Sequence, residues 1–138
     1  MEKIIIYTDG ASRGNPGLSS FGFVVQNLSG KLLYQCGAYI GETTNNVAEY
    51  TAVISALKYV SQNYKAGEIE IELRADSNLV IQQLSGRFKV NKPHIFELVQ
   101  RVKEIEVLFR KVTYKHIARE LNKMADRVAN MALDNLHS

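Results

Sequence analysis

The spacing of apolar residues changes once along this chain, and that change limits the fold more than any other feature. Residues 3–9 are β-formers that include three consecutive isoleucines, which predicts a strand buried on both faces. Residues 20–27 and 31–40 predict two more strands around a turn at Ser29-Gly30. A glycine-rich stretch separates the first strand from the second: Gly10, Gly14, Pro16 and Gly17. The first forty residues therefore indicate an antiparallel meander.

Helical and strand patterns alternate after residue 40. Apolar residues at helical spacing between Val47 and Val60 predict a helix, with Thr44 or Asn45 as its N-cap. Alternating apolar and charged residues predict a strand at 68–75. The pattern then predicts a helix at 77–84, a helix from Pro93 onward and a strand at 111–117. A closing helix is marked by Leu121, Met124, Ala125, Val128, Ala132, Leu133 and Leu136.

This order of elements predicts an α/β fold with a mixed five-stranded sheet, three antiparallel strands followed by two parallel ones, flanked by helices. Strands joined through a crossover helix run parallel, so strands 68–75 and 111–117 should run parallel to the first. No internal repeat, linker or low-complexity segment interrupts the sequence. We therefore expect a single domain over residues 1–138, long enough to bury one core.

The composition is that of a soluble globular protein, with 46% hydrophobic and 22% charged residues. No apolar run is long enough to span a bilayer, and the N-terminus does not read as a secretory signal. The single Cys36 cannot form an internal disulfide, which fits a reducing compartment. We expect a cytoplasmic protein, with no membrane partner and with the monomer as its default state. The net charge of +3 would not repel a polyanion, but it does not identify one.

Two aspartates follow two strands that should be parallel neighbours. Asp9 is expected to end the first strand and Asp76 the fourth, so both carboxylates should emerge at the sheet edge where open α/β sheets place their sites. Glu49 falls one turn into the first helix, and Asp126 falls in the first turns of the last. Each residue alone has a simpler explanation. Glu49 and Asp126 would complement helix dipoles, Asp9 would make a turn, and the Asp76 segment would cap a helix.

Taken together, the four carboxylates point to a metal centre. Clustered carboxylates repel one another, so they gather only where protons or cations neutralise them. Oxygen ligands without a nearby Cys or His favour Mg²⁺, or Mn²⁺ as a substitute, over zinc. Two such ions ~3.5–4 Å apart can activate a water and stabilise the leaving oxygen of a phosphodiester. The set therefore indicates a metal-dependent nuclease.

Four strings of the sequence resemble, in order, the motifs of type 1 ribonucleases H. They are TDGASRGNPG at 8–17, TNNVAE at 44–49, ADS at 75–77 and HIARELNKMAD at 116–126. The resemblance extends over the whole chain and implies the ribonuclease H-like fold. It also implies an endonuclease that cuts the RNA strand of RNA–DNA hybrids by two-metal-ion hydrolysis, leaving 5′-phosphate and 3′-hydroxyl ends. Contacts with 2′-hydroxyl groups are the physical means of telling RNA from DNA.

The same resemblance implies a role for each matching residue. Asp9 would bridge both ions, Asp126 would complete the ion that activates water, and Glu49 and Asp76 would complete the ion at the leaving oxygen. The residues implied to line the hybrid are Gly10, Ser12, Asn15, Asn45, Asn46 and Asn78. A pocket for a DNA phosphate would be made by Thr44, Asn15 and Asn91. Asn15 is also explained as a turn residue, and Asn91 equally well as the cap before Pro93.

Many family members carry an auxiliary histidine before the last aspartate, and two residues here compete for that role. Arg119 lies seven residues before Asp126, where a compact subgroup carries arginine, whereas His116 lies ten residues before it. We favour Arg119, because no flexible glycine-rich loop surrounds His116. The simpler alternatives are that Arg119 pairs with an acidic group and that His116 is a strand residue.

The sequence also departs from well-known members of the family. It lacks the Lys- and Trp-rich insertion that follows the Asp-Ser helix, has no Trp, and has only residues 87–92 in that place. We expect Phe88 to pack into the core and the basic residues of this segment to form a solvated turn: Arg87, Lys89 and Lys92. Binding should then be weaker and more salt-sensitive than in members with the insertion. Glu42 stands where several relatives carry arginine, so the phosphate pocket should be weaker, unless Glu42 points to solvent.

Two other functions stay open at this level. The first is a non-catalytic nucleic-acid binding module, although a binder has no reason to keep four carboxylates facing a polyanion. The second is another enzyme of the wider fold, such as a transposase, an exonuclease or a phosphate-binding ATPase domain. The segment 10–17 superficially resembles a phosphate loop but lacks the GK[ST] ending, and the chain is short for a two-domain ATPase.

Overall fold

The computed structural model describes residues 2–137 and confirms the expected α/β architecture. The strands are β1 (Glu2–Gly14), β2 (Gly17–Asn27), β3 (Leu32–Thr43), β4 (Ile69–Ala75) and β5 (Lys111–His116). The helices are α1 (Asn45–Asn63), α2 (Asn78–Leu84), α3 (Pro93–Glu106) and α4 (Lys123–Asp134). Short 3₁₀ turns occupy Ala66–Glu68, Arg119–Leu121 and Asn135–His137. Within this range no helix is both long and apolar enough to cross a membrane.

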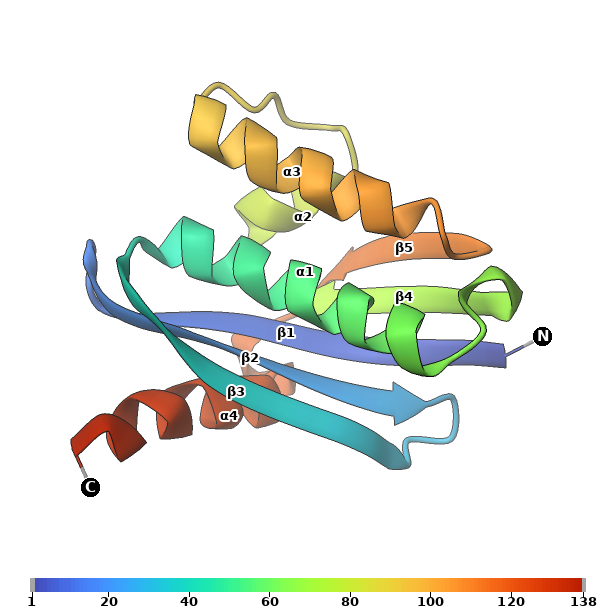
Figure 1. Ribbon diagram of the computed structural model, residues 1–138, viewed down its shortest axis with the longest axis horizontal. Helices are drawn as coiled ribbons and strands as arrows, with labels where there is room; N and C mark the ends of the chain where they lie inside the picture. The colour runs from blue at the N-terminus through green and yellow to red at the C-terminus, as the bar shows by residue number, and fades with distance from the viewer. Residues whose placement is uncertain (1, 138) are drawn as a thin grey trace.

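The sheet has the strand order β3-β2-β1-β4-β5, so the first strand lies at its centre (Figure 1). β2 pairs antiparallel with both β1 and β3, and β4 pairs parallel with both β1 and β5. This is the predicted meander followed by two crossover connections. The central position of β1 explains its run of isoleucines, since a central strand between two helical layers has no solvent-facing side.

β1 is longer than the sequence predicts, and the expectation that it ends at Asp9 is wrong. The strand continues to Gly14, and β2 already begins at Gly17, so most of the glycine-rich stretch is strand rather than loop. The reason is that pairing with β2 continues to Gly14↔Gly17, whereas pairing with β4 stops at Thr8↔Ala75. Asp9 thus lies in mid-strand, yet one residue beyond the last pair with β4. It still reaches the edge where β4 ends.

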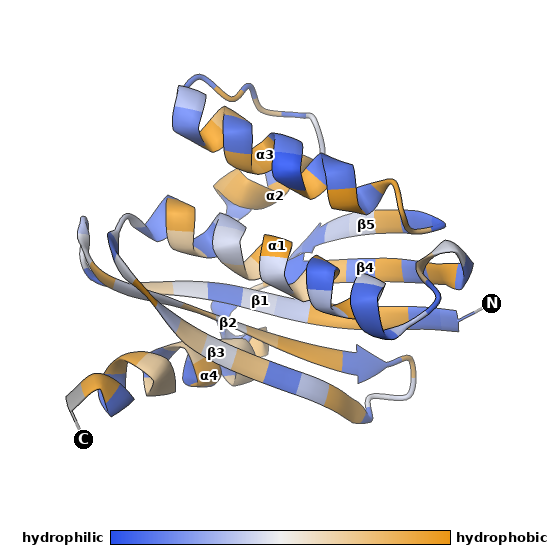
Figure 2. Ribbon diagram, in the orientation of Figure 1, coloured by the Kyte–Doolittle hydropathy of each residue, from blue (hydrophilic) through white to orange (hydrophobic). Residues whose placement is uncertain are grey.

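Helices cover both faces of the sheet in unequal layers. α1, α2 and α3 lie on one face and α4 lies on the other (Figures 1 and 2). Ile4 and Ile6 belong to the large core beneath α1, whereas Ile5 alternates to the opposite face, which α4 covers. The core beneath α1 also takes in buried residues of α2 and α3. The layer beneath α4 is smaller and rests on Ala125, Ala129 and Leu133.

Three expectations for the second half of the chain are wrong in detail. Phe88 is 47% exposed instead of packing into the core, because the amides of residues 87 and 88 both bond to the carbonyl of Gln82 and turn the chain outward. The cap position of α3 is Lys92 rather than Asn91, and no side chain bonds there. The closing helix begins at Lys123, so Leu121 lies before it and is 68% exposed.

Candidate active site

Asp9 is placed by the central strand and is almost fully buried, with 5% of its surface exposed. The next residue is Gly10, where an added Cβ would lie 2.5 Å from the amide nitrogen of Glu49 and 2.6 Å from the carbonyl carbon of Ala48. Both are backbone atoms of α1, so they could not move aside as a flexible side chain would. The missing side chain at Gly10 therefore lets the helix approach the strand closely and brings Glu49 beside Asp9.

Glu49 is carried by the first turns of α1 and is 8% exposed. The helix begins at Asn45 because Thr44 caps it, its hydroxyl accepting the amide hydrogen of Val47 at 3.3 Å. The predicted capping role therefore falls to Thr44 rather than to Asn45. The Oε2 atom of Glu49 is buried and accepts no hydrogen bond. A buried carboxylate oxygen in that state indicates a cation or proton site.

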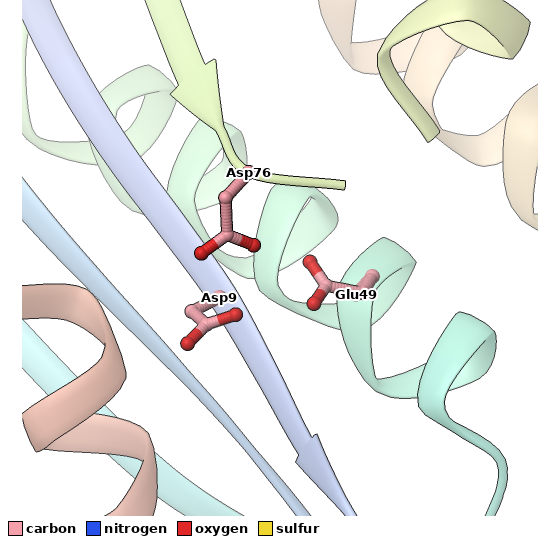
Figure 3. A group of neighbouring side chains, drawn as sticks. All are labelled: Asp9, Glu49 and Asp76. Carbon is pink, nitrogen blue, oxygen red and sulfur yellow. The ribbon is translucent and has the colours of Figure 1, made fainter. Parts of the chain in front are cut away.

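Asp76 follows the last residue of β4 and is half-buried. Ser77, not Asp76, caps α2, by accepting the amide hydrogen of Val80 at 3.4 Å. The Asp76 side chain takes no part in that cap and points toward Asp9 and Glu49 (Figure 3). One oxygen from each of Asp9, Glu49 and Asp76 lies within 4.8 Å of the others (Figure 3). The three side chains come from a strand, a helix and a strand end, and they converge on one point.

Asp126 reaches the same region from α4, on the opposite face of the sheet. Two glycines make this possible, because a Cβ at Gly22 or Gly37 would lie 2.6 Å or less from backbone atoms of α4. Asp126 is exposed, and Asn130 donates from Nδ2 to its Oδ1 at 3.1 Å. All four carboxylates line one pocket of about 410 Å³.

The electrostatics of the pocket favour protons or cations. Burial raises the pKa of Asp9 far above its ordinary value, and the nearby charges of Glu49 and Asp76 raise it further. Burial also raises the pKa of Glu49, although a hydrogen bond with Asp9, the Gly10 amide and the charge of Arg119 work in the opposite direction. Both shifts favour the protonated carboxyl, and a bound divalent cation would take the place of those protons.

Several other residues predicted from the sequence line the same pocket. They are Gly10, Ser12, Asn45, Asn46 and Arg119. Asn15 lies beside them at the β1–β2 turn, where its Oδ1 accepts the amide hydrogen of Asn45 at 3.1 Å. His116 is exposed and does not line the pocket; its Nε2 lies 3.3 Å from the main-chain oxygen of Asp76.

The structure does not bring the remaining predicted residues into the pocket. Thr44 is occupied as the cap of α1, and Asn78 accepts from Gln82 within α2 at 3.2 Å. Asn91 is exposed in the segment between α2 and α3. The three residues suggested for a phosphate pocket are thus split, with Asn15 and Thr44 near the start of α1 and Asn91 on a different segment.

Sequence reasoning missed four residues that line the pocket: Ala11, Arg13, Ser77 and Asn130. Arg13 is inside the first motif, but only the extension of β1 brings it to the pocket, where it pairs with Asp134 at 2.5 Å. Asn130 follows Asp126 by one helical turn, and that spacing was an available signal. Asn122, a buried residue behind Asp76, was also missed.

A larger hollow of about 720 Å³ lies at the opposite edge of the sheet, where β1 and β4 begin. Its lining includes Tyr64, Lys65 and Arg110. The convergent acids lie in the smaller pocket, so chemistry rather than volume identifies the candidate site.

Comparisons with known proteins place this chain in a family. A family model described as "Reverse transcriptase-like" matches residues 7–132. The chain is 40% identical to "Ribonuclease HI" of Halobacterium salinarum, covering 96% of this chain and 65% of that protein. It is 39% identical to the "Bifunctional protein Rv2228c" of Mycobacterium tuberculosis, covering 96% of this chain and 36% of that protein. The chain thus spans between about a third and two thirds of these curated relatives.

A solved structure also matches this chain over nearly its full length. LC11-RNase H1, crystallised in complex with an RNA/DNA hybrid, superposes with a TM-score of 0.93 at 41% identity. The match covers 98% of this chain and 99% of that one. Sequence and fold agree, and the chain belongs to the ribonuclease H family.

Proposed function

We propose that this chain is an endonuclease that hydrolyses the RNA strand of RNA–DNA hybrids with divalent metal ions, leaving 5′-phosphate and 3′-hydroxyl ends. The observation that carries the proposal is the convergence of Asp9, Glu49 and Asp76 within 4.8 Å, with Asp126 on the same pocket. Such crowding of acids is unfavourable without a cation. The relative solved with an RNA/DNA hybrid supports the choice of substrate.

The residues present fit Mg²⁺, with Mn²⁺ as a substitute. All four candidate ligands are carboxylates, and the unpartnered Glu49 Oε2 is the kind of hard oxygen that such ions bind. Asp9 would be shared between two ions, Asp126 would complete one, and Glu49 and Asp76 the other. When bound, the ions would activate a water and stabilise the leaving 3′ oxygen.

The protein's own groups orient the substrate around this centre. The pocket is lined by the Gly10 backbone and by the polar side chains of Ser12, Asn45 and Asn46, which suit contacts with sugar and backbone of the RNA strand. Arg119 lines the same wall, and its positive charge would attract the polyanion. We assign Arg119 as the auxiliary residue, and we keep Asn15, Thr44, Asn78 and Asn91 as outer contacts of the hybrid.

Affinity should be modest, because the chain offers little beyond the pocket to grip a duplex. The segment 87–92 lies at the surface and carries three basic residues, but it is short. We also propose that residues 1–138 act as one domain and as a monomer. The free thiol of Cys36 supports placing the protein in a reducing compartment such as the cytoplasm. Light scattering after size exclusion tests the oligomeric state.

The decisive experiment is cleavage of a strand-labelled RNA–DNA hybrid beside duplex RNA and duplex DNA, with Mg²⁺, Mn²⁺ or EDTA. We expect metal-dependent cutting of the RNA strand alone. Asp9→Asn should abolish turnover without lowering the free energy of unfolding, because it removes a buried, repelled carboxylate. An intact hybrid under every condition would overturn the proposal and favour a binding module. A stability loss of several kcal/mol in Asp9→Asn, as for a broken buried ion pair, would contradict the charge argument.

A further inference from the structure

Asn122 is a polar residue held in the interior directly behind the acidic pocket. It is 1% exposed and immediately precedes α4. At that position an asparagine side chain usually caps the helix by accepting a backbone amide hydrogen. Here the side chain makes no such bond to α4. The side-chain amide of Asn122 therefore has a role other than capping α4.

The bonds of Asn122 reach the segments that carry three of the four carboxylates. Its Nδ2 donates to the main-chain oxygen of Thr8, the neighbour of Asp9, at 2.9 Å. The same Nδ2 donates to Oδ2 of Asp76 at 3.4 Å. Its own main-chain oxygen accepts the amide hydrogen of Asp126 at 3.1 Å. One residue thus links β1, the end of β4 and the start of α4.

The orientation of the amide follows from its neighbours. Both atoms facing Nδ2 are acceptors, a carbonyl and a carboxylate, so only the NH₂ group suits that side. The Oδ1 atom is left buried without a partner. A buried acceptor without a hydrogen bond is unfavourable. The orientation is nevertheless kept, because it lets Nδ2 donate toward Asp76.

We propose that Asn122 is a positioning residue that holds the Asp76 carboxylate toward Asp9 and Glu49 and so sets the affinity of the site for divalent metal. The inference rests on the proposed metal-dependent function and deepens it. Groups that hydrogen-bond a metal ligand typically change metal affinity or activity by ~10–100-fold when they are removed. Asn122 is buried behind the carboxylates and acts on metal and substrate through them, chiefly through Asp76.

The test compares Asn122→Ala with Val60→Ala, a truncation in the core at the end of α1 remote from Glu49. Calorimetry would measure Mg²⁺ binding to the protein alone, and kinetics would give kcat and KM for the hybrid. We expect Asn122→Ala to weaken Mg²⁺ binding and lower kcat by ~10–100-fold, with KM for the hybrid nearly unchanged. Val60→Ala should lose stability but keep its Mg²⁺ affinity.

A second measurement needs no variant at Asn122. The side-chain NH₂ resonances of Asn122 in the wild-type protein should shift when Mg²⁺ is added, and that shift should be lost in Asp76→Asn. Wild-type Mg²⁺ affinity and kcat in Asn122→Ala would overturn the inference, as would resonances that Mg²⁺ does not move. Should the wild type bind Mg²⁺ but not cut the hybrid, only the proposed function would fail, because the binding and resonance measurements need no substrate.

Discussion

Asp9 and Glu49 are more deeply buried than carboxylates usually are. The free energy of unfolding should therefore depend on pH. The folded pKa of each lies above its ordinary value of 3.8 or 4.5. Above those ordinary values the folded state therefore binds more protons than the unfolded state does. Stability from these groups is then fully present at low pH and declines as pH rises through the folded pKa values.

We therefore expect the metal-free protein to become less stable from about pH 5 to about pH 8, as measured by urea unfolding in EDTA. Mg²⁺ should restore the loss at the higher pH, because bound cations replace the protons. Asp9→Asn serves as the control and should show a flatter dependence. If the stability of the wild-type protein instead rises with pH, burial does not raise the pKa values of these two carboxyls.

Arg119 and His116 are the two candidates for the auxiliary role, and their side chains face different groups. Arg119 lines the pocket, whereas His116 faces the main-chain oxygen of Asp76. Arg119→Ala should lower kcat partially, by less than the ~10²–10³-fold that loss of one oxyanion-hole donor costs. His116→Ala should retain most activity. Single-turnover cleavage of the hybrid checks both, and an inactive His116→Ala beside an unaffected Arg119→Ala would reverse the assignment.

At the level of elements, the site depends on helices that approach strands more closely than side chains normally permit. α1 contacts β1 across Gly10, and α4 contacts β2 and β3 across Gly22 and Gly37. These glycines are needed for the space they leave rather than for an unusual φ. The acids on α1 and α4 reach the sheet edge because these contacts are backbone to backbone.

Gly10→Ala tests this close approach. Its Cβ would meet backbone atoms at 2.5 and 2.6 Å, so α1 must shift, at a cost of about 1–3 kcal/mol in the free energy of unfolding. Mg²⁺ binding should weaken too, since Glu49 moves with the helix. Gly67→Ala is the matched control, because nothing lies within 4 Å of its added Cβ. Urea unfolding and calorimetry give both quantities; equal behaviour of the two variants would refute the packing argument.

Across the whole molecule, the two helical layers differ in how firmly they are held. α1 buries nine residues beneath one face of the sheet, whereas α4 buries three on the other. A layer with less buried apolar surface opens locally at lower free energy. Yet α4 carries Asp126, so the weaker layer supplies the fourth ligand of the candidate metal site.

Hydrogen exchange should show this asymmetry directly. In EDTA, amides of α4 should exchange faster than those of β1 and the middle of α1, and Mg²⁺ should slow α4 selectively. Asp126→Asn should lose most of the Mg²⁺ effect on α4 while keeping its metal-free pattern. Uniform protection of both layers without metal would mean that the two faces unfold as one unit.

The order of the elements, the mixed sheet and the four carboxylates could be predicted from the amino-acid sequence, because hydrophobic periodicity and local motifs are recorded residue by residue. The sequence also offered Thr44 or Asn45 as the cap of α1, and the structure selects Thr44. The sequence did not determine where β1 ends, since the partner that extends it lies on β2. It likewise misplaced Phe88, whose exposure follows from backbone bonds to Gln82.

How the acids meet and what holds them depends on contacts that exist only in the folded chain. The distances among Asp9, Glu49 and Asp76 depend on close helix–strand contacts at glycines whose neighbours are remote in sequence. Arg13, Asn130 and Asn122 joined the site only when β1 and α4 were placed against one another. Periodicity reports which face of an element is buried, but the partner buried against it is a property of the whole fold.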